Sequence, residues 1–255
     1  MALDLSEITA FAHELADASG AVCRQYFRGQ FELDDKSDAS PVTSADKGAE
    51  RVLRQMIGER FPDHGIFGEE EGVEGLDRPY VWVLDPIDGT RAFATGLPVY
   101  GTLIALMHEG KPIFGLCDMP SLDERYASTQ ARQTVSTVSS LAQARLRYTS
   151  HQIFSAEDWP AIQELEASCR FLHPGGDCYN YCLLAEGHCD LVVEAGLQPY
   201  DFLALEPIVR AAGGIMTDWQ GQPLTLESEG KVVAAATDAL HQQTLTILNR
   251  KQNHV

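Results

Sequence analysis

Two aspartates, Asp85 and Asp88, stand at the end of an apolar run and could bind a divalent cation together. The run Tyr80-Val81-Trp82-Val83-Leu84 is rich in β-branched and aromatic residues, which is typical of a buried strand. Two carboxylates at the end of such a strand repel each other unless a cation neutralises them. Hard divalent ions prefer oxygen ligands, and the backbone carbonyl of Ile87 can join the two side chains. The spacing therefore suggests a metal site, and its alternative is an ordinary Asp-Gly turn.

Gly89 and Thr90 follow the aspartates and lead into a predicted helix at residues 91–94. Backbone N–H groups at a helix start are suited to holding a phosphate. Two other acidic features could take part in this chemistry. Three consecutive glutamates at 69–71 stand between glycines, where a solvated run of charge is the alternative. Asp201 opens another predicted helix, where an ordinary N-cap is the alternative.

Four short segments stand in an order and at separations that resemble a known family. They are Ser40-Pro41-Val42-Thr43-Ser44-Ala45-Asp46, Gly68-Glu69-Glu70, Asp85-Pro86-Ile87-Asp88-Gly89-Thr90, and Asp201 ahead of Ala212-Gly213-Gly214. Together they resemble the inositol monophosphatase superfamily of Mg²⁺-dependent phosphatases, from about residue 8 to residue 245. The resemblance implies an α/β fold (α+β layered), an α/β/α/β/α sandwich of the inositol monophosphatase and fructose-1,6-bisphosphatase type. It also implies a homodimer.

The resemblance further implies a metal site that binds two or three Mg²⁺ per subunit. The ligands that it implies are the side chains of Glu69, Asp85, Asp88 and Asp201, with the backbone carbonyl of Ile87.

The same resemblance assigns catalytic and phosphate-binding roles to neighbouring residues. Asp46 and Thr90 are expected to orient and deprotonate the attacking water, beside the catalytic carboxylate Glu69. The backbone amides of Gly89 and Thr90 are expected to hold the phosphate, with Glu70 as a neighbouring acid.

The substrate is indicated by residues outside the shared motifs. Gly176 and Asp177 lie where inositol-type relatives carry a neutral segment, so Asp177 adds a carboxylate to the substrate wall. Glu194 matches a position that contacts the non-phosphate end of the substrate. Two acids there suit a cationic substrate, and histidinol phosphate carries an ammonium group and an imidazole. The alternative for Asp177 is the N-cap of a helix over 178–186.

Further segments resemble the histidinol-phosphate phosphatase branch of the family. They are residues 91–96, 100–106 and 198–202. The sequence therefore favours a phosphatase that hydrolyses L-histidinol phosphate in histidine biosynthesis. Two alternatives stay open: a phosphatase for inositol 1-phosphate or for a broad set of sugar and nucleotide phosphates, and a catalytically silent, acidic cation-binding protein. The Asp46 and Thr90 pair argues against the silent protein, because passive metal binding would not need it.

Hydrophobic periodicity predicts the elements that must position these residues. Helices are expected at about 8–29, 44–60, 156–169, 177–186, 201–212 and 238–249, and strands at 80–84, 99–107, 112–117, 145–149 and 190–193. The polar segment 31–41 reads as an exposed loop, in which Lys36 could approach a third metal or the phosphate. We expect one domain over residues 1–255, with two lobes at about 1–140 and 141–255.

Composition limits the partners of the chain. Its 255 residues include 19 Lys+Arg and 37 Asp+Glu, a formal net charge of −18, which argues against nucleic acid and anionic membranes. No apolar run is long enough to span a membrane, and the basic region of a signal peptide is missing, so a cytoplasmic protein is expected. The six cysteines lack a CxxC spacing and are expected to be reduced, buried side chains. A zinc site is the alternative, but no ligand spacing supports one at Cys178, Cys182, Cys189 and His188. Bound Mg²⁺ would bring the site to a neutral or positive charge and allow a small phosphorylated metabolite to bind.

Overall fold

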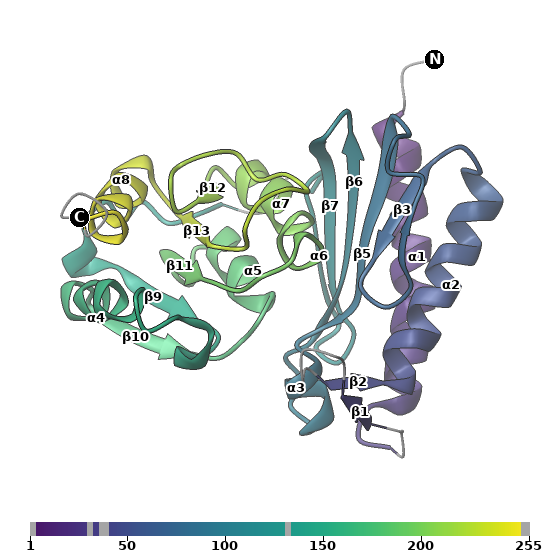
Figure 1. The fold of residues 1–255 in the computed structure, drawn as a ribbon, viewed down its shortest axis with the longest axis horizontal. Helices are drawn as coiled ribbons and strands as arrows, with labels where there is room; N and C mark the ends of the chain where they lie inside the picture. Colours follow the sequence, from purple (N-terminus) through teal and green to yellow (C-terminus); the bar gives the residue numbers. More distant parts are fainter. Residues whose placement is uncertain (1–3, 30–32, 36–40, 131–133, 251–255) are drawn as a thin grey trace.

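The chain folds into five alternating layers of helices and sheets in a computed structural model that describes residues 4–29, 33–35, 41–130 and 134–250 (Figure 1). Two long helices form the first outer layer, three short helices lie between the two sheets, and two helices form the other outer layer. In that order they are α1 (Leu5–Tyr26) and α2 (Ser44–Arg60), then α5 (Tyr179–Ala185), α6 (Pro199–Phe202) and α7 (Leu205–Ala211), then α4 (Trp159–Ser168) and α8 (Asp238–Leu248). The predicted α/β/α/β/α sandwich is confirmed.

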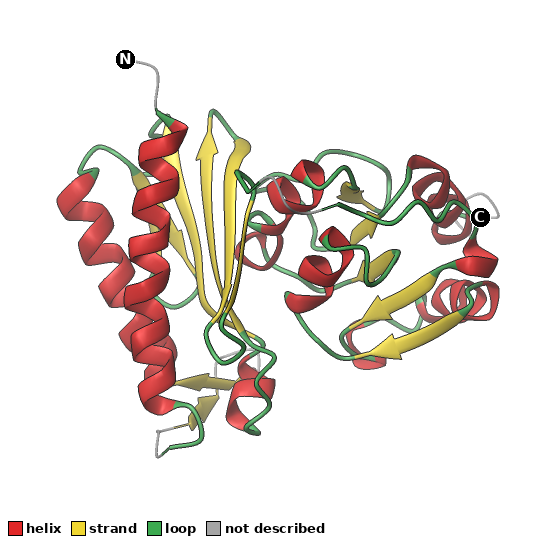
Figure 2. Cartoon of the chain, turned by 180° about the vertical axis from the view of Figure 1, so that it is seen from behind, coloured by secondary structure: helices red, strands yellow, loops and turns green. Residues whose placement is uncertain are grey.

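The first sheet has six strands in the order β4-β3-β5-β6-β7-β8. They are β3 (Gly65–Gly68), β4 (Gly72–Glu74), β5 (Tyr80–Asp88), β6 (Gly101–His108), β7 (Lys111–Met119) and β8 (Glu124–Ala127). Figure 2 shows α1 and α2 side by side along one face of this sheet. On β5, Trp82 and Leu84 pack in the core cluster beneath these helices, whereas Val81 and Val83 pack toward the central helices. Burial on both faces explains why the strand is continuously apolar.

The second sheet has five strands in the order β10-β9-β11-β13-β12. They are β9 (Arg145–Tyr148), β10 (Phe171–Pro174), β11 (Leu191–Glu194), β12 (Ile215–Asp218) and β13 (Val232–Ala235). Along β11, Val192 packs toward the central helices and Val193 toward α4 and α8. The side chains of a strand alternate between the two faces of a sheet, so both faces of this sheet are also buried.

The structure differs from the sequence prediction in three places that matter for the site. Strand β5 continues to Asp88, so Asp85 lies inside the strand rather than after it. The predicted helix 201–212 is two helices, because Pro207 has no N–H and is tolerated only in a first turn, here that of α7. The segment 31–41 contains β1 (Leu33–Asp35), which pairs with β2 (Pro41–Thr43), and Lys36 lies outside the described residues.

Among the described residues, no helix is both long and apolar enough to cross a membrane. All six cysteines are free thiols, and five of them are buried. The prediction of reduced, mostly buried cysteines is therefore confirmed.

Candidate metal and phosphate site

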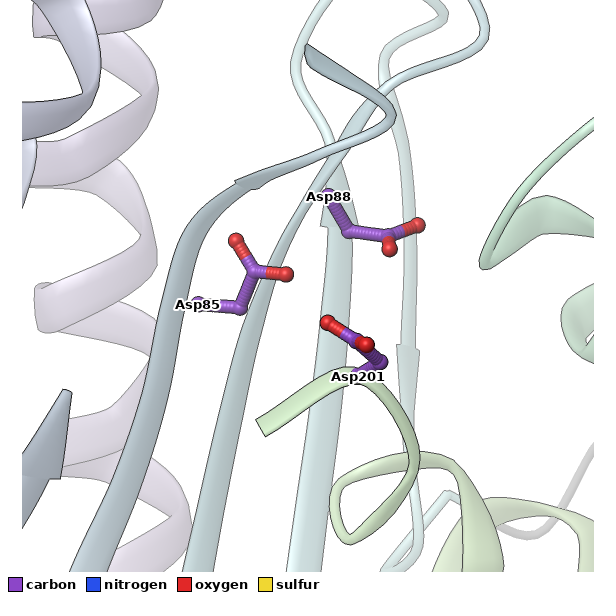
Figure 3. A group of neighbouring side chains, drawn as sticks. All are labelled: Asp85, Asp88 and Asp201. Carbon is purple, nitrogen blue, oxygen red and sulfur yellow. The ribbon is translucent and has the colours of Figure 1, made fainter. Parts of the chain in front are cut away.

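Three aspartates converge where the first sheet meets the central helices. Asp85 and Asp88 come from the end of β5, and Asp201 comes from α6 and points toward them (Figure 3). Each can place one carboxylate oxygen within 4.8 Å of the others. Asp85 is buried and the other two are half-buried. This arrangement is a compact set of hard oxygen ligands, as a divalent cation requires.

The convergence of Asp85 and Asp88 depends on an irregularity in β5. Residues three apart in a regular strand point to opposite faces of the sheet. The pairing of β5 with β6 shifts register between these two residues. Within that shift, the amide of Ile87 donates to Asp85 Oδ1 over 3.0 Å, which bends the strand end. The bulge therefore turns both carboxylates toward the same space.

Burial and mutual repulsion disfavour the charged form of these carboxyls. Burial raises the pKa of Asp85 and of Asp88 well above the usual range, and neighbouring carboxylates add to the effect. Burial, with the nearby Glu69 charge, raises the pKa of Asp201 to about 8. A bound divalent cation would reverse this preference, because it favours ionised ligands. The chemistry of the ligand set therefore fits a metal such as Mg²⁺.

Glu69 adds a fourth carboxylate from the loop that follows β3. Its amide donates to the carbonyl of Leu84 over 3.1 Å, which places it beside β5. Its side chain is close enough to Asp85 to raise the pKa of that residue through both charge and a hydrogen bond. Glu69 and Ile87 both line the cavity at the site. All five predicted metal ligands therefore line one cavity, and the three aspartates form its compact group.

Thr90 links this group of carboxylates to helix α2. Its hydroxyl Oγ1 lies 3.0 Å from the carbonyl oxygen of Ile87 and 3.4 Å from Asp46 Oδ1. Asp46 is fully buried in the first turn of α2 and does not line the cavity. The bond with Thr90 therefore connects Asp46 to the cavity.

Gly89 forms the turn between β5 and the short helix α3 (Thr90–Ala94). Its φ is +84°, in the left-handed region that favours glycine. A Cβ atom on Gly89 would lie 3.1 Å from the carbonyl oxygen of Val99 and 3.3 Å from the Asp177 carboxyl group. Glycine therefore allows this turn to approach the opposite wall of the site closely.

A cavity of about 230 Å³ lies over the carboxylates, between segments of both sheets. The first sheet and α3 contribute Glu69, Asp85, Ile87, Asp88, Gly89, Thr90 and Arg91. The later part of the chain contributes Thr149, Ser150, Ile153, Asp177, Cys178, Tyr181, Glu194, Leu197 and Asp201.

Asp177 lines this cavity beside Gly89 and has a φ of +44°. The N-cap of α5 is Cys178, and no side chain caps that helix. The capping alternative for Asp177 is therefore wrong. Burial raises the pKa of Asp177 to about 6, although the nearby Arg91 acts in the opposite direction. The amide of Cys178 donates to Asp88 Oδ2 over 2.6 Å, which joins this segment to the metal ligands.

Glu194 lies at the end of β11, where it is buried and lines the same cavity. Its Oε1 accepts from the amide of Thr149 at 2.9 Å and from the hydroxyl of that residue at 2.5 Å. Its Oε2 accepts from the Tyr181 hydroxyl at 3.2 Å. Burial raises the pKa of Glu194 to about 7. The hydrogen bonds fix the carboxylate in place in the cavity.

Two predicted substrate-binding residues do not line the cavity. Gly176 has a φ of +116° and shapes the turn before Asp177. The amide of Glu70 donates to Oε2 of Glu50 on α2 over 2.7 Å, away from the cavity lining. Tyr181 also lines the cavity, four residues after Asp177 in a predicted helix, and no motif in the sequence marks it.

The zinc site considered from the sequence does not form. The group of three or more metal-ligating side chains found in the described part of the chain consists of the three aspartates. Cys178, Cys182 and Cys189 are buried, whereas His188 is exposed and lies 3.8 Å from Glu186.

Comparisons with known proteins agree on one family. A model of the inositol monophosphatase family matches residues 4–253. The chain is 47% identical over 264 residues to the bifunctional phosphatase IMPL2, chloroplastic, of Arabidopsis thaliana, covering 96% of this chain and 76% of the relative. It is 34% identical over 233 residues to the histidinol-phosphatase of Chlorobaculum parvum, covering 88% and 90% of the two chains. A solved inositol monophosphatase from Zymomonas mobilis has 42% identity and a TM-score of 0.87, covering 97% and 99%.

Proposed function

Because the chain belongs to the inositol monophosphatase family and is a phosphoric monoester hydrolase, we propose that its substrate is L-histidinol phosphate. Hydrolysis would give L-histidinol and phosphate, a step of histidine biosynthesis. The observation that carries this proposal is the pair of carboxylates, Asp177 and Glu194, that line the same cavity as the metal ligands. The relationship to a histidinol-phosphatase at 34% identity supports it.

The proposed cofactor is Mg²⁺, two or three ions per subunit. The ligands would be the side chains of Glu69, Asp85, Asp88 and Asp201, with the carbonyl oxygen of Ile87. When bound, Mg²⁺ supplies positive charge that neutralises the phosphate and lowers the pKa of a coordinated water. The raised pKa values of the aspartates are consistent with a site that ionises fully only with its cation.

Thr90 and Asp46 would remove the proton from the attacking water. When the Thr90 hydroxyl donates to Asp46 Oδ1, now 3.4 Å away, a lone pair of Oγ1 is free to accept a proton from water. The proton of Thr90 would pass to Asp46 as the water proton arrives on Thr90, which is general-base catalysis through a relay. The amides of Gly89 and Thr90 would hold the phosphate oxygens at the same turn.

Asp177 and Glu194 would bind the cationic end of the substrate. The ammonium group of histidinol phosphate is positive, and Asp177 and Glu194 are the acids lining the cavity that are not proposed metal ligands. With pKa values of about 6 and about 7, both acids ionise more completely when a cation lies beside them. A neutral polyol would gain no such charge pairing.

Inositol 1-phosphate is the second candidate substrate, within a broader set of sugar and nucleotide phosphates. The 42% identity to the inositol monophosphatase from Zymomonas mobilis favours it. The third possibility, a silent cation-binding protein, is contradicted by membership of a family of phosphatases.

The substrate proposal is tested by phosphate release from histidinol phosphate, inositol 1-phosphate and fructose 1,6-bisphosphate, each with Mg²⁺ and with EDTA. We expect the highest kcat/KM for histidinol phosphate and loss of all activity in EDTA. A higher kcat/KM for inositol 1-phosphate would contradict the proposal that histidinol phosphate is the substrate. Full activity in EDTA would contradict the proposed need for a metal.

A further inference from the structure

Helix α2 carries a second buried carboxylate one turn after Asp46, and we propose that this residue, Glu50, positions Glu69 for metal binding. The inference rests on the proposed role of Glu69 as a metal ligand. Glu50 is fully buried and does not line the cavity. It is therefore a positioning residue, which acts on the site through the backbone of the loop that carries Glu69.

The contacts of Glu50 lie on the loop immediately after Glu69. Its Oε2 accepts from the amide of Glu70 over 2.7 Å, and its Oε1 accepts from the amide of Glu71 over 3.0 Å. One carboxylate therefore holds two consecutive backbone amides. On the other side, the amide of Glu69 itself donates to Leu84 on β5. These bonds fix the backbone of Glu69 from both directions.

Arg54 completes the arrangement, one turn further along α2. Its Nε donates to Glu50 Oε1 over 2.7 Å, and its Nη2 donates to the carbonyl oxygen of Gly72 at the end of the same loop. The Arg54 side chain is 14% exposed and the Glu50 side chain 0%. A buried carboxylate needs an opposite charge and several donors to be tolerated, and Glu50 has both.

Gly68 makes this close approach possible. A Cβ atom at Gly68 would lie 2.0 Å from Glu50 Oε1, so no larger residue fits while the carboxylate keeps its place. The spacing of Asp46, Glu50 and Arg54 puts them on one stripe of the helix, four residues apart. The same stripe therefore reaches Thr90 through Asp46 and the Glu69 loop through Glu50. Helix α2 sets the distance between the proposed proton acceptor and the proposed metal ligand.

The inference is tested by calorimetric titration of the metal-free protein with Mg²⁺, without substrate. Residues that orient metal ligands typically change metal affinity by about 10–100-fold when they are replaced. We expect Glu50→Gln to raise the Kd for Mg²⁺ by about tenfold or more. At saturating Mg²⁺, kcat should return to within about threefold of the native value, because the ligands themselves are intact. Glu59→Gln, an exposed change on the same helix, should leave the Kd unchanged.

Two further variants separate the possible outcomes. Glu69→Gln should weaken Mg²⁺ binding at least as much as Glu50→Gln does. If Glu69→Gln leaves the Kd unchanged, the proposed metal role of Glu69 fails. If Glu69→Gln weakens binding but Glu50→Gln stays within twofold of native, only the positioning inference fails. Should Glu50→Gln not fold, Arg54→Gln is measured instead and must raise the Kd.

Hydrogen exchange on the native protein gives an independent readout. The amides of Glu70 and Glu71 should exchange slowly, because the buried carboxylate accepts both of them. Exchange at the rate of an open loop would contradict the inference.

Discussion

At the scale of single residues, the site is a group of acids whose burial and mutual repulsion disfavour their charged forms. The four carboxylates on the metal side could be predicted, because short motifs carry them and two of them follow a run of apolar residues. Glu50 could not, since a lone glutamate on an amphipathic helix has the pattern of a solvent-facing residue. Its role depends on contacts with Gly68, Glu70 and Glu71. These residues lie outside helix α2, so the helical periodicity of the sequence does not predict the contacts.

Asp177→Asn tests whether this carboxylate selects a cationic substrate. Asparagine tolerates the left-handed φ of +44°, so the change removes the charge with little backbone strain. We expect KM for histidinol phosphate to rise about tenfold, as one lost charge pairing would cause, with little change for inositol 1-phosphate. Steady-state kinetics on the two esters measure this difference.

Asp123→Asn is the matched control for that change. Asp123 also has a positive φ, +58°, and it is exposed and absent from the cavity lining. It should leave both KM values unchanged. An equal rise for both esters in Asp177→Asn would assign Asp177 a purely structural role.

At the scale of elements, the end of β5 and the turn into α3 determine the geometry of the site. The apolar run predicted the strand but not its continuation to Asp88, because the bulge depends on pairing with β6. The break between α6 and α7 had a signal in Pro207. The pairing of β1 with β2 had none, since both strands are three residues long.

Gly89→Ala tests the turn that joins these elements. At a φ of +84° an alanine costs roughly 1–2 kcal/mol of stability, and its Cβ would contact Val99 and Asp177. We expect a loss of that size in urea unfolding and a fall in kcat/KM of about tenfold or more, because the turn must move away from the opposite wall.

Gly110→Ala separates the conformational cost from the contacts. Gly110 has a similar φ of +76°, and a Cβ atom there would have no neighbour within 4 Å. Its loss of stability should be comparable and its kcat/KM native. If both variants keep native kcat/KM, the turn at Gly89 does not position catalytic groups.

At the scale of the whole molecule, the chain joins two halves of the site that lie far apart in sequence. The amide of Cys178 binds Asp88, 90 residues away, and the second sheet supplies Glu194. Layer order could be predicted from the resemblance, but these contacts depend on how the two sheets pack. The homodimer, the two lobes and the cytoplasmic location stay predictions.

The metal-free protein should lose stability as the pH rises. The folded pKa values of Asp85, Asp88 and Asp201 are raised above the unfolded value of 3.8, and that of Asp201 reaches about 8. Below the unfolded pKa, the three carboxyls are protonated in both the folded and the unfolded state. Their contribution to the free energy of unfolding is then at its largest. Between that value and the folded pKa, the folded state binds more protons, so the free energy of unfolding falls.

Thermal unfolding at pH 6 and pH 8.5 measures this effect. In EDTA we expect the Tm at pH 8.5 to be about 4 °C or more below the Tm at pH 6. Added Mg²⁺ should raise Tm more at pH 8.5 than at pH 6, since it binds the ionised carboxylates. Asp201→Asn should reduce the difference, and Asp77→Asn, an exposed change, should not. A Tm gain from Mg²⁺ that is independent of pH would contradict the coupling.

The most direct test of the account is phosphate release by Asp88→Asn with histidinol phosphate and Mg²⁺. Asparagine keeps an oxygen for the bond from the Cys178 amide, so the native circular dichroism spectrum should be retained. The missing negative charge should cost several kcal/mol of transition-state stabilisation, a fall in kcat of roughly 10³-fold or more. Turnover within tenfold of native, in a folded variant, would contradict the claim that these carboxylates hold the catalytic metal.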